Sequence, residues 1–237
     1  MFFSMNLTYK NILAKAHYHN IEKNIIDSFL KKQTLGKTLS LLDVGCGIGE
    51  YVSTFKKYKL DFMGVDISKE MVNNANKAGH NAILLDDLKE QVKQFDIVFI
   101  SHVIEHLDTE TLIEFLNFYI GKLKKGGQLI LLSPLGVDNF YYDITHIRAY
   151  YPQAIWQMWG DYSSSLSIKK NEQLKLTDIY FVKDSYRTRK WRSYYINDNK
   201  LAFYFTCIIN YITAALFLLS NAAIGKKTSW IGVYKKK

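Results

Sequence analysis

The hydrophobic residues change their rhythm along the chain. Between residues 9 and 30 they recur at intervals of three and four, which predicts an amphipathic helix that ends before Gly36. Short apolar runs then alternate with helical segments, and the runs cover residues 39–44, 62–65, 82–85, 97–100 and 128–132. Such an alternation is typical of a parallel sheet with helices on both faces. We therefore expect an α/β, doubly wound fold whose ligands bind beyond the carboxyl ends of the strands.

Polar residues and glycines mark the ends of these helices. Ser68 and Asp108 each precede an apolar pattern of helical period and are predicted to cap a helix. Gly126 and Gly127 follow the second of these patterns, so we expect them to end that helix and to turn the chain into the next strand.

A glycine cluster follows the first predicted strand directly. Gly45, Gly47 and Gly49 permit a tight turn and a close approach of the backbone to a ligand, and Asp66 ends the next strand about 20 residues later, where it can accept ribose hydroxyls. A dinucleotide fingerprint requires a glycine at the position of Glu50. An acidic side chain there disfavours a pyrophosphate, whereas a sulfonium ligand meets no such penalty.

Two motifs carry a resemblance to a known family. The run Leu-Leu-Asp-Val-Gly-Cys-Gly-Ile-Gly-Glu-Tyr at 41–51 and the run Phe-Asp-Ile-Val-Phe-Ile-Ser-His-Val-Ile-Glu-His-Leu at 95–107 resemble class I S-adenosylmethionine-dependent methyltransferases. The resemblance covers about residues 39–134. It implies a Rossmann-like, mostly parallel seven-stranded sheet with an antiparallel last strand, S-adenosyl-L-methionine as cofactor, and one domain over 1–237 with its cofactor-binding core at 37–134.

The same resemblance assigns roles to individual residues. It implies that the glycine loop passes under the methionine moiety and that acids after the second and third strands hold ribose and adenine. Ser101 and His102 would line the methionine side. Ordinary capping or loop acids are the alternative for the carboxylates, and Glu105-His106 is interpreted as the opening of a helix. The implied contacts are Asp43, Gly45 and Gly47 in the loop, Asp66 with Ile67 at the ribose, and Asp86 or Asp87 at the adenine.

The acceptor is expected to bind within residues 135–173, after the fifth strand. The pattern Asp143-x-Thr-His146-x-Arg148 loosely resembles methyltransferases of glycans and polysaccharide precursors. For a hydroxyl acceptor, His146 can take a proton, Asp143 can orient it and Arg148 can hold a phosphate or carboxylate. Nearby tyrosines can stack on a sugar: Tyr141, Tyr142, Tyr150 and Tyr151. The alternative is a loop–helix junction in which Asp143 caps a helix and His146 packs.

The two ends of the chain are expected to be helical. Residues 1–36 would form a lid, whose His17 and His19 we interpret as solvated or core side chains. An uncharged helix over 201–225 would connect the last two strands, predicted at 174–186 and 230–234. A single membrane crossing would separate two strands of one sheet, so this helix must lie on a surface or pack. Its polar residues fall near one stripe, and basic residues flank it within 187–227.

Composition narrows the choice of partners. The chain has 237 residues, 48% of them hydrophobic, and two cysteines, which disfavours disorder and a disulfide scaffold and favours a reducing compartment. Residues 183–237 carry a net charge of +9, which equals that of the whole chain, whereas residues 39–107 carry −3. This distribution favours an anionic membrane surface over nucleic acid. A dimer interface or the core is the alternative place for the uncharged helix. The Cys, His and acidic residues show no metal spacing, so no metal is expected.

These observations together predict an S-adenosylmethionine-dependent O-methyltransferase for a saccharide or lipid-linked glycan. It would be cytoplasmic and peripheral at the inner face of the membrane, and it could form a homodimer. The alternatives are a small-molecule or isoprenoid-quinone methyltransferase and a non-catalytic binding module on the same fold. We expect no nucleic-acid partner, since no Asn/Asp-Pro-Pro-aromatic motif for a flipped base is present.

Overall fold

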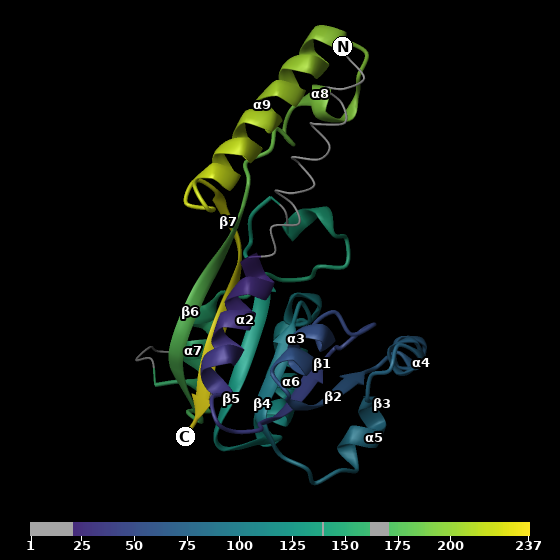
Figure 1. Cartoon of the computed structure of the whole chain (residues 1–237), viewed down its shortest axis with the longest axis vertical. Coiled ribbons are helices and arrows are strands. Elements are labelled where there is room, and N and C mark those ends of the chain that lie inside the picture. The colour runs from purple at the N-terminus through teal and green to yellow at the C-terminus, as the bar shows by residue number, and fades with distance from the viewer. Residues whose placement is uncertain (1–20, 139, 162–170) are drawn as a thin grey trace. The chain divides into compact units, whose positions relative to one another are not determined.

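The structure is a computed structural model that describes residues 21–138, 140–161 and 171–237. Seven strands form one sheet in the order β3-β2-β1-β4-β5-β7-β6 (Figure 1). The strands β1 to β5 are parallel to their neighbours, and β7 pairs antiparallel with β5. The predicted doubly wound sheet with an antiparallel last strand is therefore confirmed. The strands are β1 (Ser40–Val44), β2 (Asp61–Asp66), β3 (Ala82–Leu84), β4 (Phe95–Ser101), β5 (Leu123–Pro134), β6 (Leu174–Asp184) and β7 (Lys226–Lys236).

Helices cover both faces of the sheet because the central strands are apolar on both. Alternate residues of β4 face opposite sides: Val98 and Ile100 join the core cluster that includes α6 and α7, whereas the Phe99 ring contacts the rings of Tyr51 and Phe55 on the other side. The helices of this part are α2 (Ile21–Gln33), α3 (Val52–Lys57), α4 (Lys69–Lys77), α5 (Leu85–Lys89), α6 (Thr109–Gly121) and α7 (Pro152–Trp159). Short 3-10 helices η1 (Ile104–His106) and η2 (Phe140–Tyr142) follow β4 and β5.

Both predicted helix caps are confirmed. Ser68 Oγ accepts a hydrogen bond from Met71 N at the start of α4, and Asp108 Oδ1 accepts one from Thr111 N at the start of α6. The prediction for Gly126 and Gly127 is wrong. Helix α6 already ends at Gly121 with Lys122 as its C-cap, and both glycines lie inside β5, where Gly126 adopts φ +76°.

The N-terminal helix is described only in part. Its residues 9–20, with His17 and His19, lie outside the described residues. The described part, α2, ends at Gln33 and thus before Gly36, as predicted.

The chain divides into two compact units by its contacts. One unit comprises residues 1–21 and 182–228, and the other comprises residues 22–181 and 229–237, which include the glycine loop and the acceptor segment. The sequence predicts a single domain and does not separate these units. In the first unit, the described part contains α8 (Arg192–Tyr195) and α9 (Lys200–Leu219), which contact each other. Helix α9 ends before the predicted limit at residue 225, because Asn221 and Ala222 adopt positive φ angles of 49° and 63°.

Helix α9 has its polar stripe on the inside of this unit. Thr206, Asn210 and Ala214 are buried, and Asn210 Oδ1 accepts hydrogen bonds from the backbone N and the hydroxyl of Thr188. The opposite stripe is apolar and exposed, and it comprises Leu201, Phe205, Ile208, Ile212, Leu216 and Leu219, with exposures of 44–86%. By length and composition α9 is also the one helix among the described residues that could cross a membrane.

Candidate functional site

The glycine loop lies at the carboxyl end of β1 and is attached to β2. Gly45 N and Cys46 N donate hydrogen bonds to Val65 O over 2.8 and 3.1 Å. Gly45, Gly47 and Gly49 adopt φ angles of +68°, +52° and +90°, which glycine tolerates best. A Cβ atom at Gly45 would lie 2.5 Å from Val103 Cγ2. The loop therefore requires glycine at this point for both its conformation and its packing.

Asp66 fixes the middle of that loop. Gly47 N donates to its Oδ2 over 3.0 Å, and Ser68 N donates to its Oδ1 over 2.9 Å. A carboxylate can accept about four hydrogen bonds, so two acceptor positions remain for ligand hydroxyls. Ile67 beside it is 82% exposed and can cover a ligand. The structure thus gives Asp66 a structural role that the sequence did not suggest, and ribose recognition by its remaining acceptor positions stays a prediction.

Asp43 is the buried acid of the site. Its side chain lies at the end of β1, and the residue is 5% exposed. Burial raises the pKa of Asp43 to about 7, and the negative charges of Asp66 and Glu50 add to the shift. A carboxyl group in this state is readily ionised by a nearby cation.

Asp86 and Asp87 occupy the first turn of α5 rather than a loop. Both are exposed, and Asp86 Oδ1 pairs with Lys89 Nζ over 2.9 Å. A contact of either residue with adenine stays a prediction.

His102 lies between two carboxylates after β4. Its φ is +55°, its Nδ1 lies 3.2 Å from Glu105 Oε1, and its Nε2 lies 3.2 Å from Glu22 Oε2. Burial lowers the pKa of His102, but the hydrogen bonds to Glu105 and Glu22 and their charges outweigh it and raise the pKa to about 10. Ser133 Oγ donates to the other oxygen of Glu105 over 3.4 Å. The imidazolium is therefore already neutralised by the protein.

Sequence reasoning missed this group of charges. Glu105 opens the 3-10 helix η1, as the structural interpretation of Glu105-His106 predicted, but its buried carboxylate also holds His102. Glu22 lies 80 residues before His102, and no local pattern connects the two. Burial raises the pKa of the Tyr51 hydroxyl, and the nearby Ser101 side chain opposes this shift.

The acceptor segment is anchored to the same 3-10 helix. Ile147 N and Arg148 N donate to Glu105 O over 2.8 and 3.2 Å. Arg148 Nη1 donates to Thr109 Oγ1 over 2.7 Å, so the guanidinium is directed to the start of α6. Tyr150 is buried and donates to Leu107 O, which removes it from the set of stacking rings. Tyr141, Tyr142 and Tyr151 are 74%, 50% and 48% exposed and stay available.

His146 is oriented by a backbone carbonyl and not by Asp143 as the sequence suggested. Its Nδ1 lies 2.8 Å from Phe140 O, a pure acceptor, so Nδ1 carries the proton and Nε2 carries the lone pair. Asp143 Oδ2 lies 3.8 Å from Nε2, while Asp143 Oδ1 accepts hydrogen bonds from Thr145 N and Oγ1. His146 is therefore pre-set to accept a proton at Nε2, and Asp143 can stabilise the resulting cation.

One group of side chains has the composition of a metal site. Ligand atoms of Glu105, His106 and His146 lie within 4.8 Å of one another. Their sequence separation hid this grouping, since His146 follows 40 residues later. The carboxylate of Glu105 is already paired with His102, so a metal would compete with that ion pair.

Comparisons with known proteins find similarity to methyltransferases. Residues 42–131 match the family model described as "Methyltransferase domain". A curated relative, a ubiquinone biosynthesis O-methyltransferase from Pelagibacter ubique (strain HTCC1062), is 23% identical over 209 residues, which are 81% of this chain and 82% of the relative.

Solved structures share the fold over nearly the whole chain. An S-adenosylmethionine-dependent methyltransferase from Archaeoglobus fulgidus is 23% identical with a TM-score of 0.56, and the match covers 90% of this chain and 94% of that one. Magnesium protoporphyrin IX methyltransferase from Synechocystis PCC 6803, solved with S-adenosylhomocysteine, is 13% identical with a TM-score of 0.60 and coverages of 96% and 86%.

Proposed function

We propose that this chain, which is a class I S-adenosylmethionine-dependent methyltransferase, methylates a hydroxyl group of a saccharide or lipid-linked glycan at the cytoplasmic face of a membrane. The observation that carries the choice of a hydroxyl acceptor is the fixed tautomer of His146. An imidazole whose Nδ1 proton is held by a carbonyl leaves Nε2 as a base beside exposed aromatic rings.

Two features of the glycine loop and its neighbour Asp66 support S-adenosylmethionine as the cofactor. The loop at Gly45 and Gly47 lets the backbone approach the ligand, and Asp66 keeps two acceptor positions for the ribose. Ser101, beside the paired His102, lies at the methionine end, and Asp86 or Asp87 would contact the adenine. When bound, the cofactor supplies an electrophilic methyl group on a sulfonium.

The residues of the acceptor side align the hydroxyl and remove its proton. His146 Nε2 would take the proton of the acceptor hydroxyl when that oxygen receives the methyl group. Asp143 faces this nitrogen at 3.8 Å and stabilises the imidazolium. Arg148, next to Tyr150 and Thr109, is placed to bind an anionic group of the acceptor.

The pKa of Asp43 predicts how cofactor binding depends on pH. A sulfonium cation favours the ionised carboxylate, so binding releases a proton whenever Asp43 starts protonated. We expect the affinity for S-adenosylmethionine to rise between about pH 6 and 8, by at most about tenfold per pH unit below the pKa. S-adenosylhomocysteine lacks the sulfonium charge and should show a weaker dependence. Calorimetric titrations at several pH values test this, and an equally steep dependence for both ligands, or for Asp43→Asn, would contradict it.

A membrane location is supported by the exposed face of α9. Its apolar stripe is accompanied by basic residues at both ends of the helix, among them Lys200, Lys226 and Lys227. An apolar face with cationic edges binds anionic bilayers by burial and by charge. The other interpretation of the stripe is a homodimer interface, in which a second copy of the chain and not lipid would cover the apolar residues.

Vesicle flotation separates these interpretations. We expect the full chain to float with vesicles containing phosphatidylglycerol, and we expect Phe205→Glu/Ile212→Glu to remain in the soluble fraction. The matched control is Leu35→Glu/Val92→Glu, which changes two exposed apolar residues outside this unit by the same charge. Equal recovery of the native chain in the soluble fraction with and without vesicles would refute the membrane location. A shift from dimer to monomer in the α9 variant without loss of flotation would assign the stripe to a dimer.

The acceptor itself is tested with labelled cofactor. The full chain is incubated with methyl-labelled S-adenosylmethionine and a membrane lipid extract, and we expect the label in an alkali-stable methyl ether of a saccharide. Label only on nitrogen or carbon would refute O-methylation. A second candidate, an isoprenoid quinol, is favoured by the Pelagibacter relative, and recovery of the label in the quinone fraction would select it.

A further inference from the structure

The unit formed by residues 1–21 and 182–228 holds a partly buried arginine, Arg187, that forms no ion pair among the described residues. The Nε and Nη2 atoms of Arg187 are buried and have no hydrogen-bond partner among the described residues. A buried guanidinium without partners is costly, because it has lost its water and gained nothing in return. Such a group calls for a specific explanation.

The unit offers no carboxylate to pair with Arg187. Its sequence contains ten Lys and Arg but only two acids, Asp184 and Asp198. Asp198 forms a bidentate ion pair with Arg192 at 2.7 and 2.6 Å, and Asp184 Oδ1 accepts a hydrogen bond from Ser185 N. Both acids therefore have other partners, and the counter-charge of Arg187 has to come from outside the unit.

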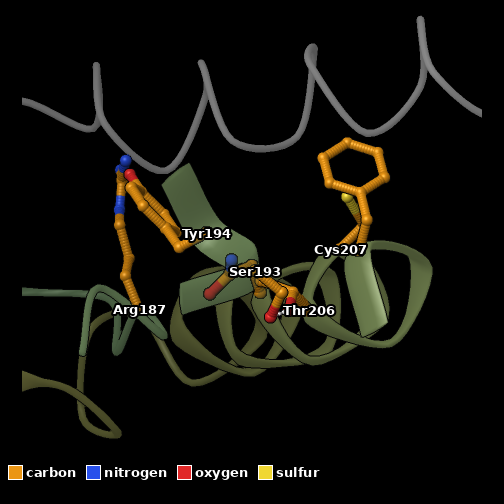
Figure 2. A pocket seen from close by; sticks show the side chains of 7 residues that line it. Arg187, Ser193, Tyr194, Thr206 and Cys207 are labelled. Carbon is orange, nitrogen blue, oxygen red and sulfur yellow. Dashed lines mark hydrogen bonds between the residues drawn. The ribbon is translucent and has the colours of Figure 1, made fainter. Parts of the chain in front are cut away.

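Arg187 faces a cavity of about 270 Å³ (Figure 2). Figure 2 shows its side chain extending beside Tyr194, with Ser193 and Thr206 on the floor of the cavity and Cys207 at the far end. The volume is just below the range of about 300–1,000 Å³ that is typical of sites for drug-sized ligands. A small anion or a polar headgroup fits this space.

The other polar groups of the cavity are already satisfied. Thr206 Oγ1 donates to Ala202 O over 2.8 Å and lies 2.6 Å from Ser193 Oγ, so Ser193 is the donor in that pair. Asn210 Oδ1 accepts two hydrogen bonds from Thr188, which leaves its Nδ2 as the remaining donor. The charged donor of the cavity is the guanidinium of Arg187, which prefers the oxygens of a phosphate or carboxylate.

We infer that this cavity is a binding site for a phosphate ester, with Arg187 as its principal ligand. The exposed apolar stripe lies on the other face of the same helix α9, so a bilayer bound to that stripe would hold phosphate groups near this unit. The phosphate can therefore come from a lipid headgroup or from a phosphorylated lipid carrier. The inference deepens the proposed function, because it specifies the phosphorylated anchor of the acceptor. In that respect the inference rests on the proposed function. Its test requires no methyl transfer, so it can fail or succeed independently of catalysis.

The experiment uses the full chain, Arg187→Gln and the control Arg192→Gln. The control removes the same charge from an exposed ion pair of the same unit. Sedimentation with phosphatidylglycerol and phosphatidylcholine vesicles tests a headgroup, and thermal unfolding in inorganic phosphate against an equal ionic strength of chloride tests free phosphate. We expect Arg187→Gln to weaken binding at least about tenfold, as for the loss of a charge-assisted hydrogen bond, and the control to bind like the native chain.

Each outcome decides the question. An effect confined to phosphatidylglycerol identifies a lipid headgroup, and stabilisation by phosphate that Arg187→Gln abolishes identifies a free phosphate ester; both support the site. Without any anion, Arg187→Gln should unfold at a higher temperature than the native chain, because it removes an unpaired buried charge. If Arg187→Gln and Arg192→Gln lose the same amount of binding, the effect is one of general electrostatics and the inference is overturned. The inference is also overturned if Arg187→Gln binds as well as the native chain does.

Discussion

Replacing His146 with alanine should lower kcat by about 10²- to 10⁴-fold, the contribution of a positioned general base. The dissociation constant of S-adenosylmethionine should not change, since His146 contacts Phe140 and lies near Asp143 rather than in the glycine loop. Steady-state kinetics and cofactor titration measure these quantities.

A neighbouring histidine provides the control. The His106 ring lies 4.9 Å from that of His146, and its Nδ1 is held by Thr145 O over 3.1 Å. His106→Ala removes an imidazole of η1 that packs against His146, but it leaves the hydrogen bond between His146 Nδ1 and Phe140 O in place, so we expect less than about a tenfold change. Full turnover by His146→Ala would show that the acceptor needs no base, as for an acceptor that binds already ionised.

The sequence allowed most of the sheet to be predicted because its strands are buried on both faces. Continuous apolar runs therefore mark β1 to β4 within a few residues, and local caps such as Ser68 and Asp108 mark the helices between them. The first half of β5 was missed because Gly126 and Gly127 interrupt the apolar run there. Glycines at a helix end and in a bent strand look alike in sequence, and only the pairing with neighbouring strands distinguishes them.

The candidate site could be predicted where its residues are neighbours in sequence or follow a strand end. The glycine loop and Asp66 satisfy this condition, since the first βα turn is one local unit. The ion pair between Glu22 and His102, by contrast, joins residues 80 positions apart, and the orientation of His146 comes from a carbonyl that any residue could supply. Such contacts depend on tertiary packing and leave no residue pattern.

Helix α9 shows a further limit of pattern analysis. The stripe of Thr206 and Asn210 is visible in the sequence, but the sequence does not tell whether this stripe faces the solvent or the interior. In an ordinary surface helix the polar stripe faces water, whereas here it is buried by hydrogen bonds to Thr188 and Ser193. This inversion exposes the apolar stripe, so the proposed binding of a bilayer would depend on the internal polar contacts of the unit.

Replacing Asp66 with alanine should reduce the affinity for S-adenosylmethionine at least about 100-fold, because two charge-assisted hydrogen bonds to the ribose would be lost at about 1.5 kcal/mol or more each. Asp66→Ala also removes the acceptors of Gly47 N and Ser68 N, so the loop should loosen and the melting temperature should fall by several degrees.

Two further variants serve as comparisons. Asp66→Asn keeps one oxygen acceptor, so its affinity for S-adenosylmethionine should lie between those of the native chain and Asp66→Ala. Asp61→Ala, at the opposite end of the same strand, is the matched control, because the Asp61 carboxylate pairs with Lys93 on the surface at 3.6 Å. It should bind within about twofold of the native chain. If Asp66→Ala loses stability but retains its cofactor affinity, Asp66 serves the loop alone, and another group must hold the ribose.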